Sequence, residues 1–312
     1  MARILVIGAG MAGLTAARRL AGSGHDVVVV DKGHAVGGRM ATRRIGDATF
    51  DHGAQHISAR SEPFRRAMED WIDEGVAHIW FRSASDTRAD RAIEPRHGGV
   101  GGMRRIPERL ADGLDVRTAV RIVSLRRKDR GWAAFDDSGD SCDADAVVLT
   151  PPLPQALDLL DGAGVVVEDR LRGVAYDACL AVMATLERAP GLPDGHCALD
   201  GDIAWMGDNH HKGASAVPAV TIHSSPAFAE RHLETSAEVW AALLVEAAEP
   251  HLGELPRVVR THRWRYAMPT TTFTDGAITV DDGLILAGEV FAGARVEGAY
   301  LSGLAAAELV AR

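Results

Sequence analysis

Residues 3–20, which read Arg3-Ile-Leu-Val-Ile-Gly8-Ala-Gly10-Met-Ala-Gly13-Leu-Thr-Ala-Ala-Arg-Arg-Leu20, decide the fold. A short apolar run leads directly into the glycine pattern G-x-G-x-x-G, and a segment rich in alanine and leucine follows. A second apolar run, Val27–Val30, ends in Asp31. This order predicts a buried parallel strand, a tight turn, a helix packed on the sheet and a second parallel strand.

Each of these residue types has a physical reason to stand where it does in a dinucleotide site. Gly8 permits the tight turn, Gly10 lets a pyrophosphate approach the backbone, and Gly13 lets the helix pack closely on the strand. The helix N-terminus attracts phosphate charge. Asp31 lies about 20 residues further on, where a carboxylate can accept from ribose hydroxyls and would repel a 2′-phosphate. The alternative is a glycine-rich turn that binds nothing.

The segment after Asp31 indicates which dinucleotide the site would bind. Asp31 is followed by Gly37-Gly38-Arg39, which resembles the second fingerprint of the flavin-dependent amine oxidase group. The resemblance implies that the glycine pair and Arg39 lie beside the pyrophosphate of FAD. Phe50-Asp-His-Gly-Ala-Gln-His56 also resembles that group, in which this segment passes close to the isoalloxazine. For Arg39 the alternative is an ordinary solvated charge.

Composition limits the class of protein. The chain has 312 residues, enough for two domains, and a net charge of −9, which disfavours nucleic acid as a partner. No apolar stretch approaches 18 residues, and the N-terminal run does not read as a signal peptide. Cys142, Cys179 and Cys197 are scattered, so neither a disulfide framework nor a metal site is expected. We therefore expect a reduced, cytoplasmic protein.

The pattern changes after about residue 159. Strands are expected over Tyr176–Leu186, Ile203–Gly207, Val217–Ser224 and Val258–Tyr266, with a helix after Thr235 that stops before Pro250. Before this region, single strands are expected over Val116–Leu125 and Ala144–Leu149. This makeup is usual for a substrate domain inserted in an FAD fold.

The expected fold class is α/β: a Rossmann-type FAD-binding domain, similar to that of p-hydroxybenzoate hydroxylase, with an inserted α+β substrate domain built on an antiparallel sheet. Residues 1–58, 96–158 and 277–312 are expected in the FAD-binding domain. Residues 59–95 and 159–276 are expected in the substrate domain.

The chain resembles bacterial renalase-like flavoproteins of the flavin amine oxidase superfamily along its whole length. The stretch from Trp205 to Lys212, the strand His262-Arg-Trp-Arg-Tyr-Ala267 and the end Arg295-Val-Glu-Gly-Ala-Tyr-Leu-Ser-Gly303 carry the resemblance. Departures are Gly213 where the family often has Pro, Glu289 where Asp is usual, and Gly101-Gly102-Met103 where Pro-Gly-Met is usual.

The motifs and the resemblance together imply a non-covalent FAD contacted by Gly8, Gly10, Met11, Ala12, Gly13, Asp31, Lys32, Gly38, Arg39, Met40, His52, Gly53, Ala54, Gln55, Val120, Gly288, Glu289, Val296, Glu297, Gly298, Ala299 and Ser302. Possible substrate-pocket residues are Trp205, Asn209, Lys212, His223, His232, Trp264, Tyr266 and Tyr300. For each pocket residue the alternative is structural packing or surface exposure. No catalytic base is assigned.

The resemblance implies oxidation of 2- or 6-dihydro isomers of NAD(P)H, with a hydride passing to flavin N5 and dioxygen yielding hydrogen peroxide. Such a donor needs orientation more than acid–base help. The first alternative is an amine oxidase, for which Lys212 would hold water near N5 and two of Tyr176, Tyr266 and Tyr300 would form an amine cage. The second alternative is a non-catalytic FAD-binding protein. Small-molecule substrate and dioxygen are the expected partners, with no nucleic acid and no membrane.

Overall fold

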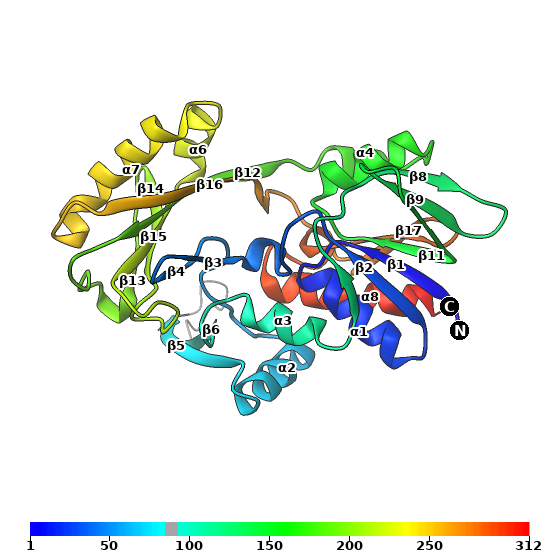
Figure 1. Ribbon diagram of the computed structural model, residues 1–312, viewed down its shortest axis with the longest axis horizontal. Coiled ribbons are helices and arrows are strands. Elements are labelled where there is room, and N and C mark those ends of the chain that lie inside the picture. The colour runs from blue at the N-terminus through cyan, green and yellow to red at the C-terminus, as the bar shows by residue number, and fades with distance from the viewer. Residues whose placement is uncertain (85–92, 312) are drawn as a thin grey trace.

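The computed structural model describes residues 1–84 and 93–311. One half is built on a six-stranded sheet in the order β17-β18-β11-β1-β2-β7 (Figure 1). Its strands are β1 (Arg3–Ile7), β2 (Asp26–Val30), β7 (Asp115–Arg117), β11 (Ala146–Leu149), β17 (Ala277–Asp281) and β18 (Leu284–Ala287). All neighbours are parallel except β17 and β18, which pair antiparallel at the edge.

Both faces of this sheet are buried, which explains why its strands read as continuous apolar runs. Ile4 and Val6 of β1 face one core, with helices α1 (Met11–Gly22) and α8 (Val296–Val310) over them. Leu5 and Ile7 face the second core, under α4 (Leu153–Gly162) and a three-stranded sheet. That sheet contains β8 (Ile122–Arg127), β9 (Trp132–Asp136) and β10 (Ser141–Ala144).

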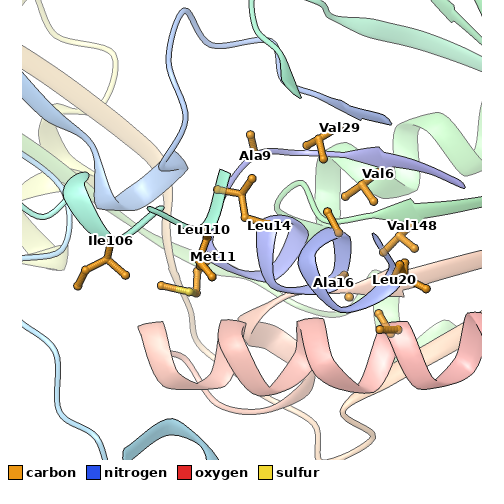
Figure 2. Packing of buried hydrophobic residues seen from close by; sticks show 14 of the residues in the cluster. Val6, Ala9, Met11, Leu14, Ala16, Leu20, Val29, Ile106, Leu110 and Val148 are labelled. Atoms are coloured by element: carbon orange, nitrogen blue, oxygen red, sulfur yellow. The ribbon is translucent and has the colours of Figure 1, made fainter. Parts of the chain in front are cut away.

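Helix α1 lies between the sheet and α8, and its apolar side chains fill this space (Figure 2). Two glycines allow the backbones of neighbouring layers to approach closely. A Cβ on Gly13 would stand 1.9 Å from the carbonyl oxygen of Gly8, and one on Gly303 would stand 2.4 Å from that of Ala12. Gly13 therefore fixes helix against strand, as the motif predicts, and Gly303 fixes α8 against α1.

The other half is built on a five-stranded antiparallel sheet in the order β13-β14-β15-β12-β16. Its strands are β12 (Tyr176–Thr185), β13 (His196–Ala198), β14 (Ile203–Asp208), β15 (Ala219–Ser224) and β16 (Arg257–Pro269). Helices α6 (Pro226–His232) and α7 (Ala237–Leu252) cover the face that carries Leu180, Val182 and Met206. In Figure 1 these helices lie on the outside, and the long strands β12 and β16 reach toward the first half.

Because side chains alternate along a strand, the opposite face of this sheet carries a different set. Register places Ala181 beside His223 and His262, His223 beside Trp205, and Gly207 beside His196. This face packs against residues 51–56, and we call the contact region the seam.

Smaller elements complete the fold. These are η1 (Gly38–Met40), the hairpins β3 (Thr42–Ile45) with β4 (Ala48–Asp51) and β5 (Ala77–Ala84) with β6 (Ile93–Gly99), α2 (Glu62–Asp73), α3 (Arg105–Ala111), α5 (Asp169–Arg172), η2 (Pro193–Gly195) and η3 (Glu289–Phe291). The expected domain boundary at residues 95 and 96 falls inside β6. No helix in the described part of the chain is long and apolar enough to cross a membrane.

The α/β class with an added antiparallel sheet is confirmed, but three elements differ from expectation. The strand expected over Ala144–Leu149 begins only at Ala146, because Ala144 ends β10 in the three-stranded sheet. The strand expected over Val116–Leu125 is split, because Ala119 has a φ of 57° and the chain leaves one sheet for another. The helix expected to stop before Pro250 continues to Leu252, which is buried, and ends at Gly253 with a φ of 71°. A proline one turn from a helix end removes a single hydrogen bond, which the burial of Leu252 can offset.

Candidate active site

Two glycine elements meet where the first strand ends. A Cβ on Gly10 would face open space, with no heavy atom within 4 Å, and a Cβ on Gly38 would stand 3.4 Å from the Cα of Gly10. Gly38 has a φ of 52°. No side chain caps the N-terminus of α1 at Gly10. The two backbones together form an open, positively polarised edge that suits a pyrophosphate.

Asp31 organises the loop on the other side of this edge. Its Oδ2 accepts from the N–H of Ala9 at 2.7 Å, and its Oδ1 accepts from that of Gly33 at 2.6 Å. Its carbonyl accepts from Val120 N–H at 2.9 Å. Val120 can therefore offer an adenine only its carbonyl, while each Asp31 oxygen keeps a lone pair for a ribose hydroxyl. The neighbouring Lys32 donates to Gln155 Oε1 at 2.7 Å.

Arg39 forms a forked ion pair with Glu289 of η3. Nη1 of Arg39 lies 2.6 Å from Oε1 of Glu289, and Nη2 bonds Oε2. The same guanidinium lies 3.4 Å from the carbonyl oxygens of Tyr266 and Ala267 at the end of β16. Arg39 thus ties the glycine loop to both the C-terminal strand exit and the antiparallel sheet.

The C-terminal segment is held by side chains that the resemblance implies for FAD. Ser302 accepts from the N–H of Gly288 at 2.7 Å. Glu297 is buried and accepts from the N–H groups of Arg60 (3.1 Å) and Ser61 (2.5 Å), just before α2. The carboxylate of Glu297 therefore points to α2, and no side chain caps the N-terminus of α8. The backbone around Val296, Gly298 and Ala299 forms that terminus.

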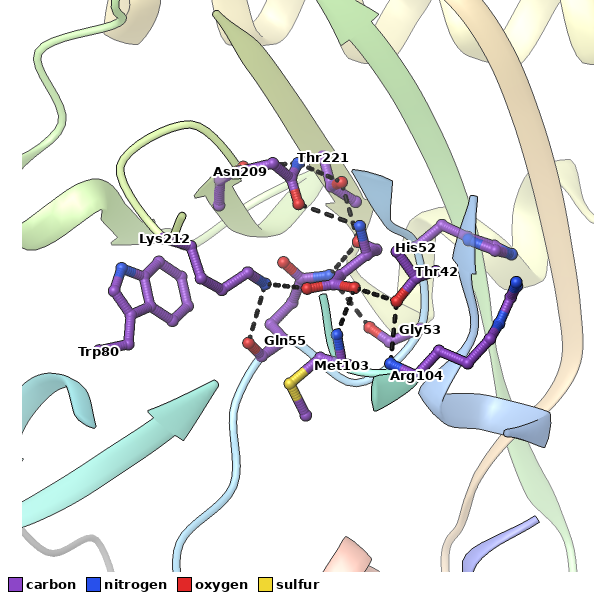
Figure 3. A network of polar contacts seen from close by, with 12 residues as sticks. Thr42, His52, Gly53, Gln55, Trp80, Met103, Arg104, Asn209, Lys212 and Thr221 are labelled. Atoms are coloured by element: carbon purple, nitrogen blue, oxygen red, sulfur yellow. Dashed lines mark hydrogen bonds and ion pairs between the residues drawn. The ribbon is translucent and has the colours of Figure 1, made fainter. Parts of the chain in front are cut away.

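A wholly buried polar network underlies residues 51–56 (Figure 3). Lys212 Nζ lies 2.9 Å from Asp51 Oδ2, 3.0 Å from the Gln55 carbonyl oxygen and 4.7 Å from the centroid of Trp80. The other Asp51 oxygen accepts from Thr42 Oγ1 at 2.5 Å and from Met103 N–H at 2.8 Å. One carboxylate thereby joins the β3–β4 hairpin, the glycine-rich loop and the antiparallel sheet.

Asn209 completes this network. Its Oδ1 accepts from Asp51 N–H at 3.0 Å, and its Nδ2 donates to Thr221 Oγ1 at 2.9 Å. Thr221 in turn donates to the Asp51 carbonyl at 2.9 Å. Asn209 is fully buried and bonds only protein groups here, so its place is structural.

The carbonyl of His52 receives two donors from the seam. Trp264 Nε1 donates at 2.7 Å and His223 Nε2 at 3.1 Å. Burial lowers the pKa of His223 to about 4. Burial, aided by the neighbouring His262, lowers the pKa of His52 to about 3. Both imidazoles are therefore neutral at pH 7.

Comparisons with known proteins place this geometry in a family. The model for NAD(P)-binding Rossmann-like domains matches residues 6–71, and that for flavin containing amine oxidoreductases matches residues 74–311. The chain belongs to the flavin containing amine oxidoreductase family. Mouse renalase is 25% identical, over 100% of this chain and 99% of that protein.

Solved structures share the fold. Putrescine oxidase bound to putrescine superimposes with a TM-score of 0.72 and 15% identity, covering 100% of this chain and 99% of that chain. A fatty acid isomerase from P. acnes superimposes with a TM-score of 0.73 and 13% identity, covering 100% and 98%. At these identities the likeness concerns the fold.

As a member of this family, the protein is an FAD-dependent oxidoreductase. The site fits the parts of the cofactor. The open backbone at Gly10 and Gly38 and the uncapped N-terminus of α1 suit its two phosphates, the lone pairs of Asp31 suit its ribose, and the uncapped N-terminus of α8 suits its pyrimidine edge.

Of the other expected contacts, Met11, Met40 and Ala12 are buried, with Met11 and Met40 in the core around α1. Ala54 donates its N–H to the Arg39 carbonyl at 2.7 Å, and Gly53 passes so close that a Cβ would stand 2.0 Å from the same oxygen.

The structure brings most of the expected pocket residues of this flavoprotein to the seam but separates two of them. His232 lies at the end of α6, with its ring 4.4 Å from that of Phe228 on the outer side of the sheet. The Tyr300 ring lies 5.0 Å from that of Phe64 and 6.1 Å from that of Trp71, between α8 and α2. These positions remove His232 and Tyr300 from the group.

Sequence reasoning missed several residues at the seam. Asp51 is the buried partner of Lys212; it lies in the quoted segment Phe50–His56, but nothing in the sequence indicates that its carboxylate pairs with a lysine. The Phe81 and His196 rings stack at 3.9 Å, His196 stacks on Trp205 at 4.8 Å, and His56 lies 5.3 Å from Trp205. His196 could have been found only from the register of β13 with β14, which the sequence does not specify.

Proposed function

We propose that this oxidase acts on 2- or 6-dihydro isomers of NAD(P)H and converts them to NAD(P)+. When bound, FAD would supply the hydride acceptor at N5 and would return the two electrons to dioxygen, with two protons, as hydrogen peroxide. The protein's own contribution would be to hold a flat dihydropyridine against the seam and to exclude water. Resemblance to renalase-like flavoproteins supports this substrate class.

One feature carries the proposal: burial lowers the pKa values of the His52, His56 and His223 imidazoles, so these groups are neutral at pH 7. Burial, aided by the charge of Arg96, lowers the pKa of His56 to about 3, as for His52. Groups with such pKa values are poor bases at pH 7 and carry no charge to repel a pyridinium product. A dihydropyridine gives up a hydride without first losing a proton, so it needs no base. An ammonium substrate does need one.

The alternative is an amine oxidase, which the family's name and the likeness to putrescine oxidase favour. An amine cage needs two aromatic faces with a gap between them. The rings of Tyr176 and Tyr266 instead meet edge to face at 5.7 Å, and Tyr300 lies elsewhere. Lys212 is engaged with Asp51 and the Gln55 carbonyl. These contacts weigh against the cage and against a lysine that holds water.

Anaerobic stopped-flow absorbance of the holoenzyme tests the proposal. The flavin band should bleach rapidly with 2- or 6-dihydro-NAD, and slowly or not at all with ordinary 4-dihydro-NADH, benzylamine or a polyamine. Bleaching by the amines alone would contradict the proposal and support the amine oxidase alternative. No bleaching by any donor would favour a non-catalytic FAD-binding protein.

A further inference from the structure

Four buried polar atoms at the seam have neither a hydrogen bond nor an ion pair with the described residues. They are Gln55 Oε1, Trp205 Nε1, His56 Nδ1 and His52 Nδ1. The Gln55 residue is 7% exposed, so its amide is nine-tenths buried. A buried polar atom without a partner costs free energy, and natural folds retain few of them. Four together, from residues that meet at one seam, indicate a group that bonds there.

The orientation of the Gln55 amide is fixed by its other end. Its Nε2 donates to the Asp51 carbonyl at 2.6 Å and to the Gly53 carbonyl at 3.1 Å. Carbonyl oxygens only accept, so the nitrogen must be on that side and the oxygen must face away. Gln55 Oε1 is therefore an acceptor that needs a donor, and Trp205 Nε1–H is a donor that needs an acceptor.

These two atoms converge over one backbone position of β14. If Gly207 carried a Cβ, that atom would stand 2.6 Å from Gln55 Oε1 and 3.2 Å from Trp205 Nε1. Glycine at 207 therefore leaves room for both groups to approach the same point. The stacked rings of Phe81, His196 and Trp205 form an aromatic wall beside it.

We infer that Gln55 and Trp205 recognise the planar primary amide of an aromatic substrate, a role that rests on the proposed function, since a nicotinamide ring carries such a group. The amide oxygen accepts from Trp205 Nε1–H, and an amide N–H donates to Gln55 Oε1. A primary amide presents a donor and an acceptor side by side and carries no charge, as a buried neutral site requires. Both residues are thus specificity residues.

Binding to the oxidised holoenzyme, measured by isothermal titration calorimetry, tests the inference without turnover. The probes are 1-methylnicotinamide and 1,3-dimethylpyridinium, which share ring and charge but differ in the amide. Wild type should bind the amide at least tenfold more tightly, the effect of one to two hydrogen bonds. Trp205→Phe keeps an aromatic side chain and removes the N–H donor, so it should weaken binding of 1-methylnicotinamide about tenfold more than binding of 1,3-dimethylpyridinium.

Trp264→Phe is the matched control, because Nε1 of Trp264 already donates to the His52 carbonyl. It should change the binding of both probes by the same factor. Equal binding of the two probes to wild type, or an equal effect of Trp205→Phe on both, overturns the inference and indicates that the two atoms serve only a water molecule.

The outcomes separate this inference from the proposed function. If dihydronicotinamides reduce the flavin and Trp205→Phe shows no amide dependence, the amide site fails and the proposed function stands. If they do not reduce it and the amide dependence is present, the proposed function fails and the amide site stands.

Discussion

Replacing Lys212 with Met should destabilise the fold far more than an ordinary loss of a lysine. The side chains of Lys212 and Asp51 are both 0% exposed, and Nζ lies 2.9 Å from the carboxylate. Removing one member of a buried pair leaves the other charge uncompensated, at a cost of about 3–5 kcal/mol. The cation also lies over Trp80, so methionine keeps part of the packing and loses that attraction.

Lys128→Met is the matched control. Lys128 also pairs with a carboxylate, Asp143, at 2.5 Å, but the two side chains are 46% and 56% exposed. Water and salt screen such a pair, so its loss should cost about 0–1 kcal/mol. Urea unfolding followed by circular dichroism gives both free energies of unfolding. Similar values for Lys128→Met and Lys212→Met would refute the reasoning.

A double variant isolates the charge. Asp51→Asn combined with Lys212→Met leaves no isolated ion in the core, so it should recover part of the stability lost in Lys212→Met alone. If Lys212 instead worked directly on the flavin, Lys212→Met would keep wild-type stability and lose activity. That result would contradict the structural role.

Three further outcomes follow from the geometry. The free energy of unfolding should be highest above pH 6.5 and fall as the pH drops toward 4. In this range the unfolded chain binds protons at His52, His56 and His223, whereas the buried imidazoles of the folded protein stay neutral. At pH 5 each of these histidines should lower the free energy of unfolding by about 2 kcal/mol, and urea unfolding that gives the same value at pH 7 and pH 5 would contradict this. Asp31→Ala and Arg39→Ala should each weaken FAD binding by about 1.5–3 kcal/mol per charged hydrogen bond lost, measured by flavin fluorescence; full affinity in both would contradict the cofactor assignment. Acid precipitation should release all flavin colour, since no cysteine or histidine follows residue 262, and a yellow pellet would contradict non-covalent binding.

The cofactor half was predictable because its signals are local. The glycine pattern, the apolar runs on either side and Asp31 lie within the first 31 residues, and backbone geometry requires their order. Gly13 occupies the contact between helix and strand that its motif predicts. The strand ends and the α/β class follow from the same periodicity.

The seam was less predictable because its contacts join distant parts of the chain. The sequence offers Lys212 as an isolated cation, and only the fold places it against Asp51 of β4, which lies far earlier in the chain. Glu297 belongs to a motif that the resemblance predicts near the flavin, yet its carboxylate accepts from the N–H groups of Arg60 and Ser61. Motifs identify the segment, whereas side-chain direction depends on what packs opposite it.

Because the seam side chains also support the fold, a loss of activity in a seam variant does not by itself identify a residue that contacts substrate. Lys212, His223 and Trp264 all bond to residues 51–55, through a carboxylate or backbone carbonyls. They therefore hold the segment that the family resemblance predicts close to the flavin. Truncating any of them shifts that segment, and activity would fall without any contact to substrate. Trp205 differs because its indole N–H is buried and bonds no described protein group. Its removal breaks no hydrogen bond within the described fold, so a change confined to amide-bearing ligands reports recognition rather than support.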